Sequence, residues 1–176
     1  MFPKAHAVAY VMMAVRIAWF KVHRPLAFYA SYFSVRATDF DAQQIVQGAA
    51  AQKAKLREFE SKGNTLTAKE KSIQTITEMA YEMYLRGFTF LPVDLYRSDA
   101  AKFQIVGNAL LPPLASLQGL GEAAAQSIVQ AREEQPFLSI EDLRSRGRIS
   151  RAIVDILKDH GCLSGLPDDD QVCLFA

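Results

Sequence analysis

Helix-breaking residues divide the first half of this chain into segments of helical length. Proline lacks the backbone N–H that a helix interior needs, so it ends one helix and is tolerated in the first turn of the next. Pro25 serves both purposes, while Gly63 and Gly87 provide later stops. The breaks predict helices over residues 5–23 and 26–36, from Asp39 or Asp41 to Gly63, and from Thr67 to Gly87. The first half is therefore predicted to be all helix.

The last of these helices carries the clearest local signals. Thr67 followed by Glu70 is the pattern of a capping box, in which each side chain bonds the other residue's backbone N–H. Beyond the cap, apolar residues recur at helical spacing. They are Ile73, Ile76, Met79, Ala80, Met83 and Tyr84. One face of this helix is therefore predicted to be buried.

The first helix is strongly apolar between residues 7 and 15. Lys4 and Lys21 bound this run and Arg16 interrupts it, which leaves it short of the roughly 20 apolar residues that a membrane span needs. We therefore expect a buried or half-buried helix and no membrane partner.

The composition, with 50% hydrophobic residues and a net charge of +1, is that of a globular chain of one domain or two small ones. Cys162 and Cys173 lack metal-ligand spacing and no secretory signal precedes them, so we expect reduced thiols and a cytoplasmic location. The charge is uneven, because no acidic residue occurs from Met1 to Thr38. This basic stretch favours an anionic partner, although each cation could instead pair with a carboxylate elsewhere in the fold.

The pattern changes in the middle of the chain. Residues 88–96 are rich in β-prone side chains, and residues 102–106 and 109–111 flank Gly107-Asn108, which is a hairpin signal. We expect one short strand and a small hairpin, which link the helical first half to a second helical unit beginning near Pro112.

Two glycines flank Leu120 in residues 117–121 of that second unit. We expect a turn too tight for side chains, with Leu120 plugged into the core and the backbone amides of Gly119 to Ala123 exposed at a helix N-terminus. Such amides suit one phosphate oxygen. The pattern resembles the helix-hairpin-helix motif, which grips the nucleic-acid backbone without reading bases. An ordinary helix–helix turn with a glycine cap is the alternative.

Two short helices are predicted after this turn, because Ser139 and Ser150 are typical N-cap residues and Gly161 ends the second helix. Arginines crowd the connection between them, where a second phosphate contact or a solvated basic loop would account for the pattern. They are Arg144, Arg146, Arg148 and Arg151. The predicted DNA-binding residues of the whole unit are Gly119, Leu120, Gly121, Ala123, Arg132, Arg148 and Arg151.

The last residues, 166–176, place a proline and three consecutive acids before Gln171, Leu174 and Phe175. A solvated leash with one amide and two apolar anchors is typical of a peptide that binds a shallow groove on a partner. The pattern Gln-x-x-Leu-Phe resembles the peptide by which bacterial replication proteins hold the sliding clamp. The alternative is a frayed terminus with two stray hydrophobic residues.

In order along the chain, these features resemble the C-terminal part of a PolC-type DNA polymerase III alpha subunit. Residues 1–10 and 13–23 are similar to the end of that family's fingers domain, and residues 93–99, the glycine turn and the final peptide continue the likeness. The resemblance implies a mainly α fold, with a helical fingers segment, a short β-hairpin, a helix-hairpin-helix domain and a flexible C-terminal tail. The implied domains are residues 1–95 for the fingers, 96–165 for duplex binding and 166–176 for the clamp-binding tail.

The resemblance also implies roles for the parts. Lys4, His6 and Tyr10 are expected to face the incoming deoxynucleoside triphosphate, and the hairpin unit to hold duplex primer-template DNA. Polymerase chemistry needs carboxylates that bind Mg²⁺, which in this family lie in a palm upstream of the fingers. No candidate set of acids precedes Asp39. We therefore expect a fragment of a replicative polymerase that binds no cofactor and has no catalytic residues or activity of its own.

Two other functions remain open from sequence alone. One is a stand-alone helix-hairpin-helix DNA-binding protein tethered to the clamp. The other is an adaptor whose basic first half docks an acidic protein and which binds no duplex.

Overall fold

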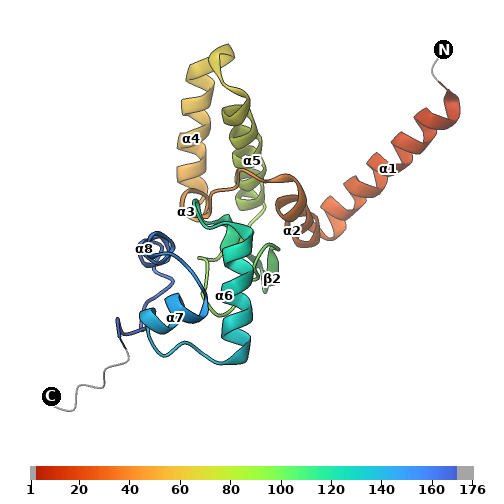
Figure 1. Cartoon of the computed structure of the whole chain (residues 1–176). Helices are drawn as coiled ribbons and strands as arrows, with labels where there is room; N and C mark the ends of the chain where they lie inside the picture. Colours follow the sequence, from red (N-terminus) through yellow and green to blue (C-terminus); the bar gives the residue numbers. More distant parts are fainter. Residues whose placement is uncertain (1–2, 170–176) are drawn as a thin grey trace.

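The computed structural model describes residues 3–169, apart from the side chain of Asn64. Its main elements are helices, as predicted (Figure 1). The helices are α1 (Lys4–His23), α2 (Pro25–Arg36), α3 (Ala42–Ile45), α4 (Ala49–Lys62), α5 (Ala68–Leu85), α6 (Glu122–Glu134), α7 (Ile140–Arg146) and α8 (Arg151–Asp159), with short 3₁₀ turns at Gly63–Thr65 and Leu114–Ser116. The strands are β1 (Thr89–Phe90), β2 (Gln104–Val106) and β3 (Ala109–Leu111).

The helix predicted from Asp39 or Asp41 to Gly63 is in fact two helices, α3 and α4. Asp41 caps α3 by accepting a bond from the Gln44 N–H, and Gly48 between the helices has φ +95°. The buried side chain of Gln52 then donates to the backbone oxygens of Gln44 and Ile45, at 2.9 and 3.2 Å. An α4 side chain thus satisfies carbonyls that a continuous helix would have bonded through its own backbone.

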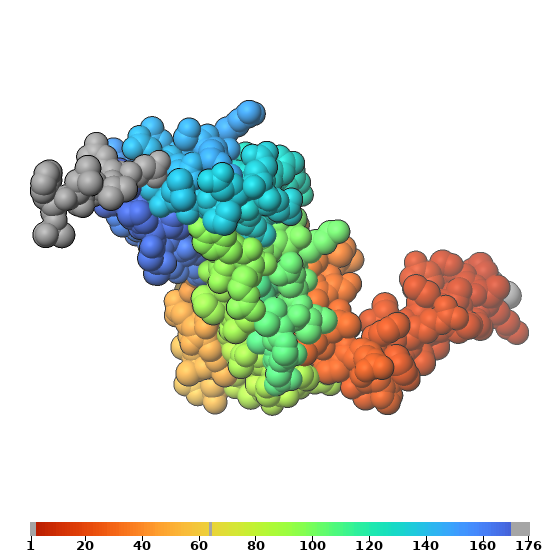
Figure 2. Space-filling model, turned by 90° about the horizontal axis from the view of Figure 1, so that it is seen from below, coloured from red at the N-terminus to blue at the C-terminus, as the bar shows by residue number. Residues whose placement is uncertain are grey.

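The expectation of a buried or half-buried first helix is wrong. None of the residues of α1 is buried, and the helix projects from the body as an arm (Figures 1 and 2). Only its end is tied down: Lys21 pairs with Glu82 of α5 at 2.6 Å, and Arg86 donates to the Lys21 carbonyl at 2.7 Å. The helix is apolar on all sides, so no single face of it marks where the rest of this chain should pack.

By length and composition alone, α1 is also the one helix of the described residues that could cross a membrane. The apolar run of residues 7–15 is shorter than the helix that contains it, which has 20 residues. Core helices of larger proteins share this length and composition.

A small sheet in the order β1-β3-β2 joins the two halves of the chain. The predicted hairpin is confirmed, since β2 pairs antiparallel with β3, and β1 adds in parallel to β3. The strand expected over residues 88–96 is much shorter, because only Thr89 and Phe90 pair with β3. The backbone beyond Pro92 bonds side chains instead of a strand.

Aromatic rings fasten the helices to the sheet. Phe33 of α2 lies 5.3 Å from Phe90 of β1, and Phe40 lies 4.8 Å from Phe103, measured between ring centroids. A second set of buried aliphatic residues forms the interior of the C-terminal unit. This set contains Leu120, Ala125, Ile128, Leu143, Val154 and Leu157.

The first residues of the predicted flexible tail are held in place. The backbone oxygens of Pro167 and Asp168 accept bonds from the N–H groups of Ile140 and Glu141, at 2.9 and 3.2 Å. The Asp168 carboxylate also lies 3.6 Å from Lys158 Nζ. We call these two hydrogen bonds and this ion pair the clasp. It corrects the prediction for residues 166–169, because amides at the start of α7 need acceptors and these carbonyls supply them.

Candidate nucleic-acid interface

The first predicted turn, residues 117–121, precedes α6 and is called turn 1. The Leu120 N–H donates to the Leu117 carbonyl at 3.0 Å, and Gly119 at the third position has φ +88°. This is the pattern of a type II turn, which favours glycine at that position. A Cβ on Gly119 would lie 2.8 Å from Ile156 Cδ1 of α8. Gly119 therefore meets both the backbone and the packing requirement that the sequence predicted.

Gly121 has a different role from the one expected. It is the N-cap of α6 with φ −69°, and a Cβ there would meet nothing within 4 Å. The prediction that both glycines are needed for tightness is wrong for this residue. No side chain caps the helix at Gly121, and the first helical bond runs from the Ala125 N–H to the Gly121 carbonyl. The N–H groups of the exposed residues Glu122 and Ala123 thus precede the intrahelical ladder.

A second turn, residues 147–150 or turn 2, precedes α8 with a similar order of features but different hydrogen bonds, because the Ile149 N–H donates to the Arg144 carbonyl at 3.2 Å. Arg148 has φ +50°, where turn 1 has Gly119. Ile149 is buried at 6% exposure, as Leu120 is at 3%. Ser150 is an N-cap with φ −75° and ψ 161°, close to the −69° and 156° of Gly121. Both α6 and α8 therefore begin after a left-handed residue, a buried aliphatic plug and an extended N-cap.

Sequence reasoning missed this equivalence because an arginine occupies the left-handed position of turn 2. Only a few per cent of residues other than glycine have positive φ, so nothing in the sequence signals the turn at Arg148. The available signal was the spacing of a buried aliphatic residue directly before an N-cap, as in Ile149-Ser150.

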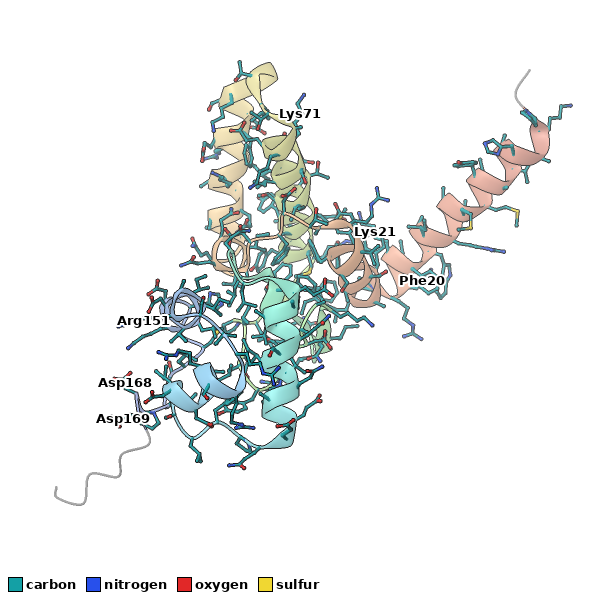
Figure 3. All side chains as sticks on the ribbon, viewed as in Figure 1. Phe20, Lys21, Lys71, Arg151, Asp168 and Asp169 are labelled. Carbon is teal, nitrogen blue, oxygen red and sulfur yellow. The ribbon has the colours of Figure 1, made fainter. Side chains whose placement is uncertain are left out.

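The arginines near turn 2 divide into two groups. Arg144, Arg148 and Arg151 are exposed, and Figure 3 shows Arg151 at the outer side of α8. Arg146 instead donates to the carbonyls of Ala131, Gln135 and Pro136 and pairs with Asp142 at 3.2 Å. It closes the C-terminal end of α6 and is not available to a ligand.

Arg132, predicted to bind DNA, is also engaged internally. Its guanidinium donates to the carbonyls of Leu95 and Ser98, the latter at 2.6 Å. The residue lies in the last turn of α6, at the other end of this helix from turn 1. The structure therefore does not bring Arg132 together with the exposed amides.

The predicted nucleotide-contacting residues lie away from both turns. Lys4, His6 and Tyr10 belong to the arm α1 (Figure 1). The ring centroids of His6 and Tyr10 are 4.5 Å apart. The clamp-binding candidates Gln171, Leu174 and Phe175 lie outside the described residues.

Within residues 3–169 there is no group of three or more His, Cys, Asp or Glu residues that could hold a metal ion.

The two turns and the helices behind them define a helix-hairpin-helix unit, and residues 87–171 match the family model described as the helix-hairpin-helix motif. Over 175 residues, or 99% of its length, the chain is 56% identical to the PolC-type DNA polymerase III of Caldanaerobacter subterraneus subsp. tengcongensis. The corresponding proteins of Halalkalibacterium halodurans and Bacillus subtilis are 55% and 54% identical over the same length. The chain therefore corresponds over 99% of its length to a part of PolC-type DNA polymerase III, and it spans 12% of the length of these relatives.

Proposed function

We propose that this chain serves as the duplex-gripping part of a replicative DNA polymerase that works in the cytoplasm. Its identity of 54–56% to PolC-type relatives and its helix-hairpin-helix match support this function. The observation that carries the proposal is that α6 and α8 each begin after a left-handed residue, a buried aliphatic residue and an extended N-cap. The N-terminus of a helix attracts phosphate through its unpaired N–H groups and dipole.

The grip is independent of base sequence. Amides near Gly121 and Ser150 each hold phosphate oxygens, and the exposed guanidiniums of Arg148 and Arg151 add charge beside turn 2. Contacts to roughly two to four phosphates release counterions, so affinity falls with salt at a slope near −0.9 per phosphate. Glu122 in the first turn of α6 opposes an anion there, which limits the affinity of turn 1.

A salt titration of duplex binding tests this proposal. Fluorescence anisotropy with a labelled duplex of mixed sequence compares the chain with the double variant Arg148→Gly plus Arg151→Gln. We expect at least a tenfold loss of affinity and a slope smaller by about 2. The matched control is Lys69→Gln plus Lys71→Gln, which removes the same charge at the start of α5, far from Arg151 (Figure 3). Equal losses of affinity in both variants would show that duplex binding depends on net charge alone. That outcome would reject the two turns as the site.

We further propose that Lys4, His6 and Tyr10 contact the incoming nucleotide once α1 lies inside a complete polymerase. Mg²⁺ belongs to acids outside this chain, so no synthesis is expected from the chain alone. In the full-length enzyme, Tyr10→Ala should raise the KM for deoxynucleoside triphosphates with a smaller change in the affinity for duplex. An unchanged KM would remove Tyr10 from the nucleotide site.

The tail is proposed to bind the sliding clamp through Gln171, Leu174 and Phe175. Val172, Cys173 and the additional Ala176 depart from the usual peptide of the family, so we expect modest affinity. Surface plasmon resonance on immobilised clamp should show binding that the double variant Leu174→Ala plus Phe175→Ala abolishes. Equal binding by the double variant would refute the tether.

A further inference from the structure

The segment after β1, residues 93–98, is held by side chains of the helix-hairpin-helix unit, and we call it the strap. The Val93 N–H donates to His160 Nε2 at 3.3 Å, and the Cys162 thiol donates to the Val93 carbonyl at 3.2 Å. Arg132 donates to the carbonyls of Leu95 and Ser98. The polar groups that a strand would have used for pairing are thus bonded to three side chains from later in the chain.

The strap is itself a rigid turn. The Asp94 carboxylate accepts from the N–H groups of Tyr96 and Arg97, both at 2.9 Å. The Asp94 N–H donates to Ser98 Oγ at 3.0 Å, and Ser98 is fully buried. At its N-terminal end, only Leu91 and Pro92 separate the strap from β1, whose Phe90 belongs to the aromatic cluster. It therefore forms a stiff connection between the sheet and the C-terminal unit.

Two of the three residues that bind the strap lie at the C-terminal ends of helices that begin at a turn. Arg132 is in the last turn of α6, the helix that begins at turn 1. His160 is the C-cap of α8, the helix that begins at turn 2. Each helix that presents a turn at its N-terminus is thus fixed to the strap at its C-terminus. Since α6 is about 20 Å long, a small rotation at the strap would displace turn 1 by several ångströms.

We propose that Arg132, His160 and Cys162 are positioning residues, which lock the helix-hairpin-helix unit onto the strap and thereby set the direction of both turns relative to the first half of the chain. The lock stands on contacts within this chain, while its bearing on DNA rests on the proposed function.

The histidine makes the lock sensitive to pH. A protonated imidazole has no lone pair on Nε2 and cannot accept from Val93. Burial lowers the pKa of His160 from its ordinary 6.5, against the opposing charge of Asp41 at the N-cap of α3. Asp94 on the strap acts on the neighbouring thiol: burial and then the charge of Asp94 raise the pKa of Cys162 to about 12, so this donor stays neutral. Because opening raises the proton affinity of His160, the lock is intact above pH 6.5 and weakens below it.

Electron-paramagnetic distance measurements on the full chain test the lock. Spin labels at Lys71→Cys on α5 and Gln126→Cys on α6, in a Cys173→Ser background, report the distance between these helices, which changes when the two halves turn relative to each other. We expect a narrow distribution at pH 7.5, which broadens in Arg132→Met and, in the otherwise unchanged chain, at pH 5.5. His160→Gln should remove most of this pH dependence, because an amide oxygen accepts at both pH values. Arg144→Met, which removes an exposed charge from α7, is the matched control.

Duplex binding separates this role from a phosphate contact. Arg132→Met should leave the salt slope unchanged, whereas a contact to phosphate predicts a slope smaller by about 0.9. The proposal is overturned if Arg132→Met and the control give equal distributions, or if the distribution of the unsubstituted chain is the same at pH 7.5 and 5.5. These distances need no DNA, so a failure of the lock is distinguishable from a failure of the proposed function.

Discussion

Gly119 is the residue on which turn 1 most depends. Its φ of +88° and the approach of Ile156 Cδ1 both oppose a side chain. Gly119→Ala should therefore lower the free energy of unfolding by about 1–3 kcal/mol, measured from urea midpoints. Gly121→Ala, with ordinary φ and open space, should change it by less than about 1 kcal/mol. Similar losses in the two variants would contradict this account of the turn.

Arg148 holds a conformation that suits glycine, at the place where a cation is useful to the proposed function. Arg148→Gly should raise stability by about 1 kcal/mol, because φ +50° is strained for a residue with a side chain. The same variant should weaken duplex binding. Chemical denaturation checks the gain in stability, and fluorescence anisotropy on the same preparation checks the loss of duplex affinity. Arg151→Gln, which alters no strained backbone, should weaken binding without the gain in stability.

Cys162 should be protected from alkylation, because burial and Asp94 raise the pKa of its thiol to about 12. Iodoacetamide at pH 8, followed by peptide mass spectrometry, should leave Cys162 unmodified in the folded chain and modify it in urea. Rapid native modification would show that the bond to Val93 is open.

The residues also show where sequence reasoning succeeds. Leu120 is buried as predicted, since the hydrophobic pattern around a glycine turn is local. Arg132 and Arg146 look like surface cations in the sequence. Their bonds go to backbone carbonyls whose positions depend on the whole fold.

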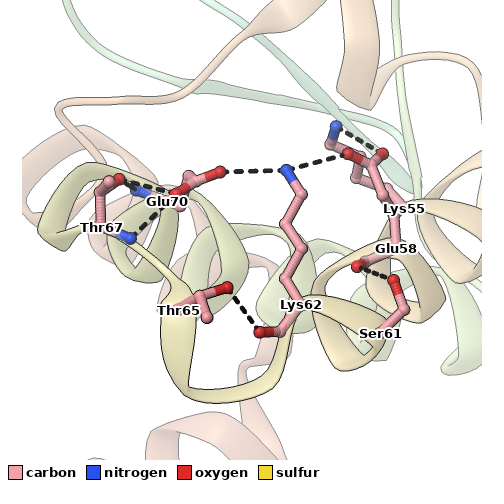
Figure 4. Close-up of polar contacts among 7 residues, drawn as sticks. All are labelled: Lys55, Glu58, Ser61, Lys62, Thr65, Thr67 and Glu70. Atoms are coloured by element: carbon pink, nitrogen blue, oxygen red, sulfur yellow. Dashed lines mark hydrogen bonds and ion pairs between the residues drawn. The ribbon is translucent and has the colours of Figure 1, made fainter.

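Among the elements, the end of α4 and the start of α5 are held together by polar contacts. Thr67 and Glu70 form the predicted capping box, and Lys62 joins Glu70 to Glu58 at 3.0 and 3.4 Å (Figure 4). Thr67→Ala should cost about 1 kcal/mol of stability by removing the cap. Amide exchange at the start of α5 measures this loss, and exchange at the start of α6 provides the internal control.

The same cap predicts a pH response. Hydrogen bonds from the Thr67 backbone and from Lys62 lower the pKa of Glu70 to about 2. Its contribution is fully present above the ordinary 4.5 and is lost as pH falls toward 2. Amides at the start of α5 should therefore exchange faster, relative to their intrinsic rates, at pH 2.5 than at pH 5. Glu70→Gln should lose most of this pH dependence.

The contrast between α5 and the strap explains which elements were predictable. The boundaries of α5 follow from residues within one turn of its ends. The strap reads as a strand by composition, but its partners are side chains of the C-terminal unit. The same contacts cross the predicted domain boundary between residues 95 and 96, which stays a prediction.

For the molecule as a whole, α1 carries most of the large apolar side chains that are exposed. Val11, Val15 and Trp19 are 62%, 62% and 51% exposed. Apolar surface of this extent usually belongs to an interface. The chain should therefore self-associate in light-scattering measurements, and Val11→Lys plus Val15→Glu should reduce the association. Ile105→Lys, at an exposed position on β2, is the control. A monodisperse unsubstituted chain would contradict the expectation.

The mainly α fold was predictable because local signals specify most of its helices. The exposure of α1 was not, since an apolar sequence predicts burial and no local signal in it shows whether the rest of this chain covers the helix.

The clasp limits the distance between α7 and a partner that binds the last residues of the chain. The chain is fixed as far as Asp168 at the start of α7, whereas turn 2 follows the other end of that helix. From Asp169 to Phe175, six peptide units span at most about 22 Å, whatever conformation they adopt. A partner that captures Phe175 is therefore confined to a small volume, at an effective concentration of the order of millimolar. Any second contact between that partner and the unit would then need little affinity of its own to be occupied most of the time.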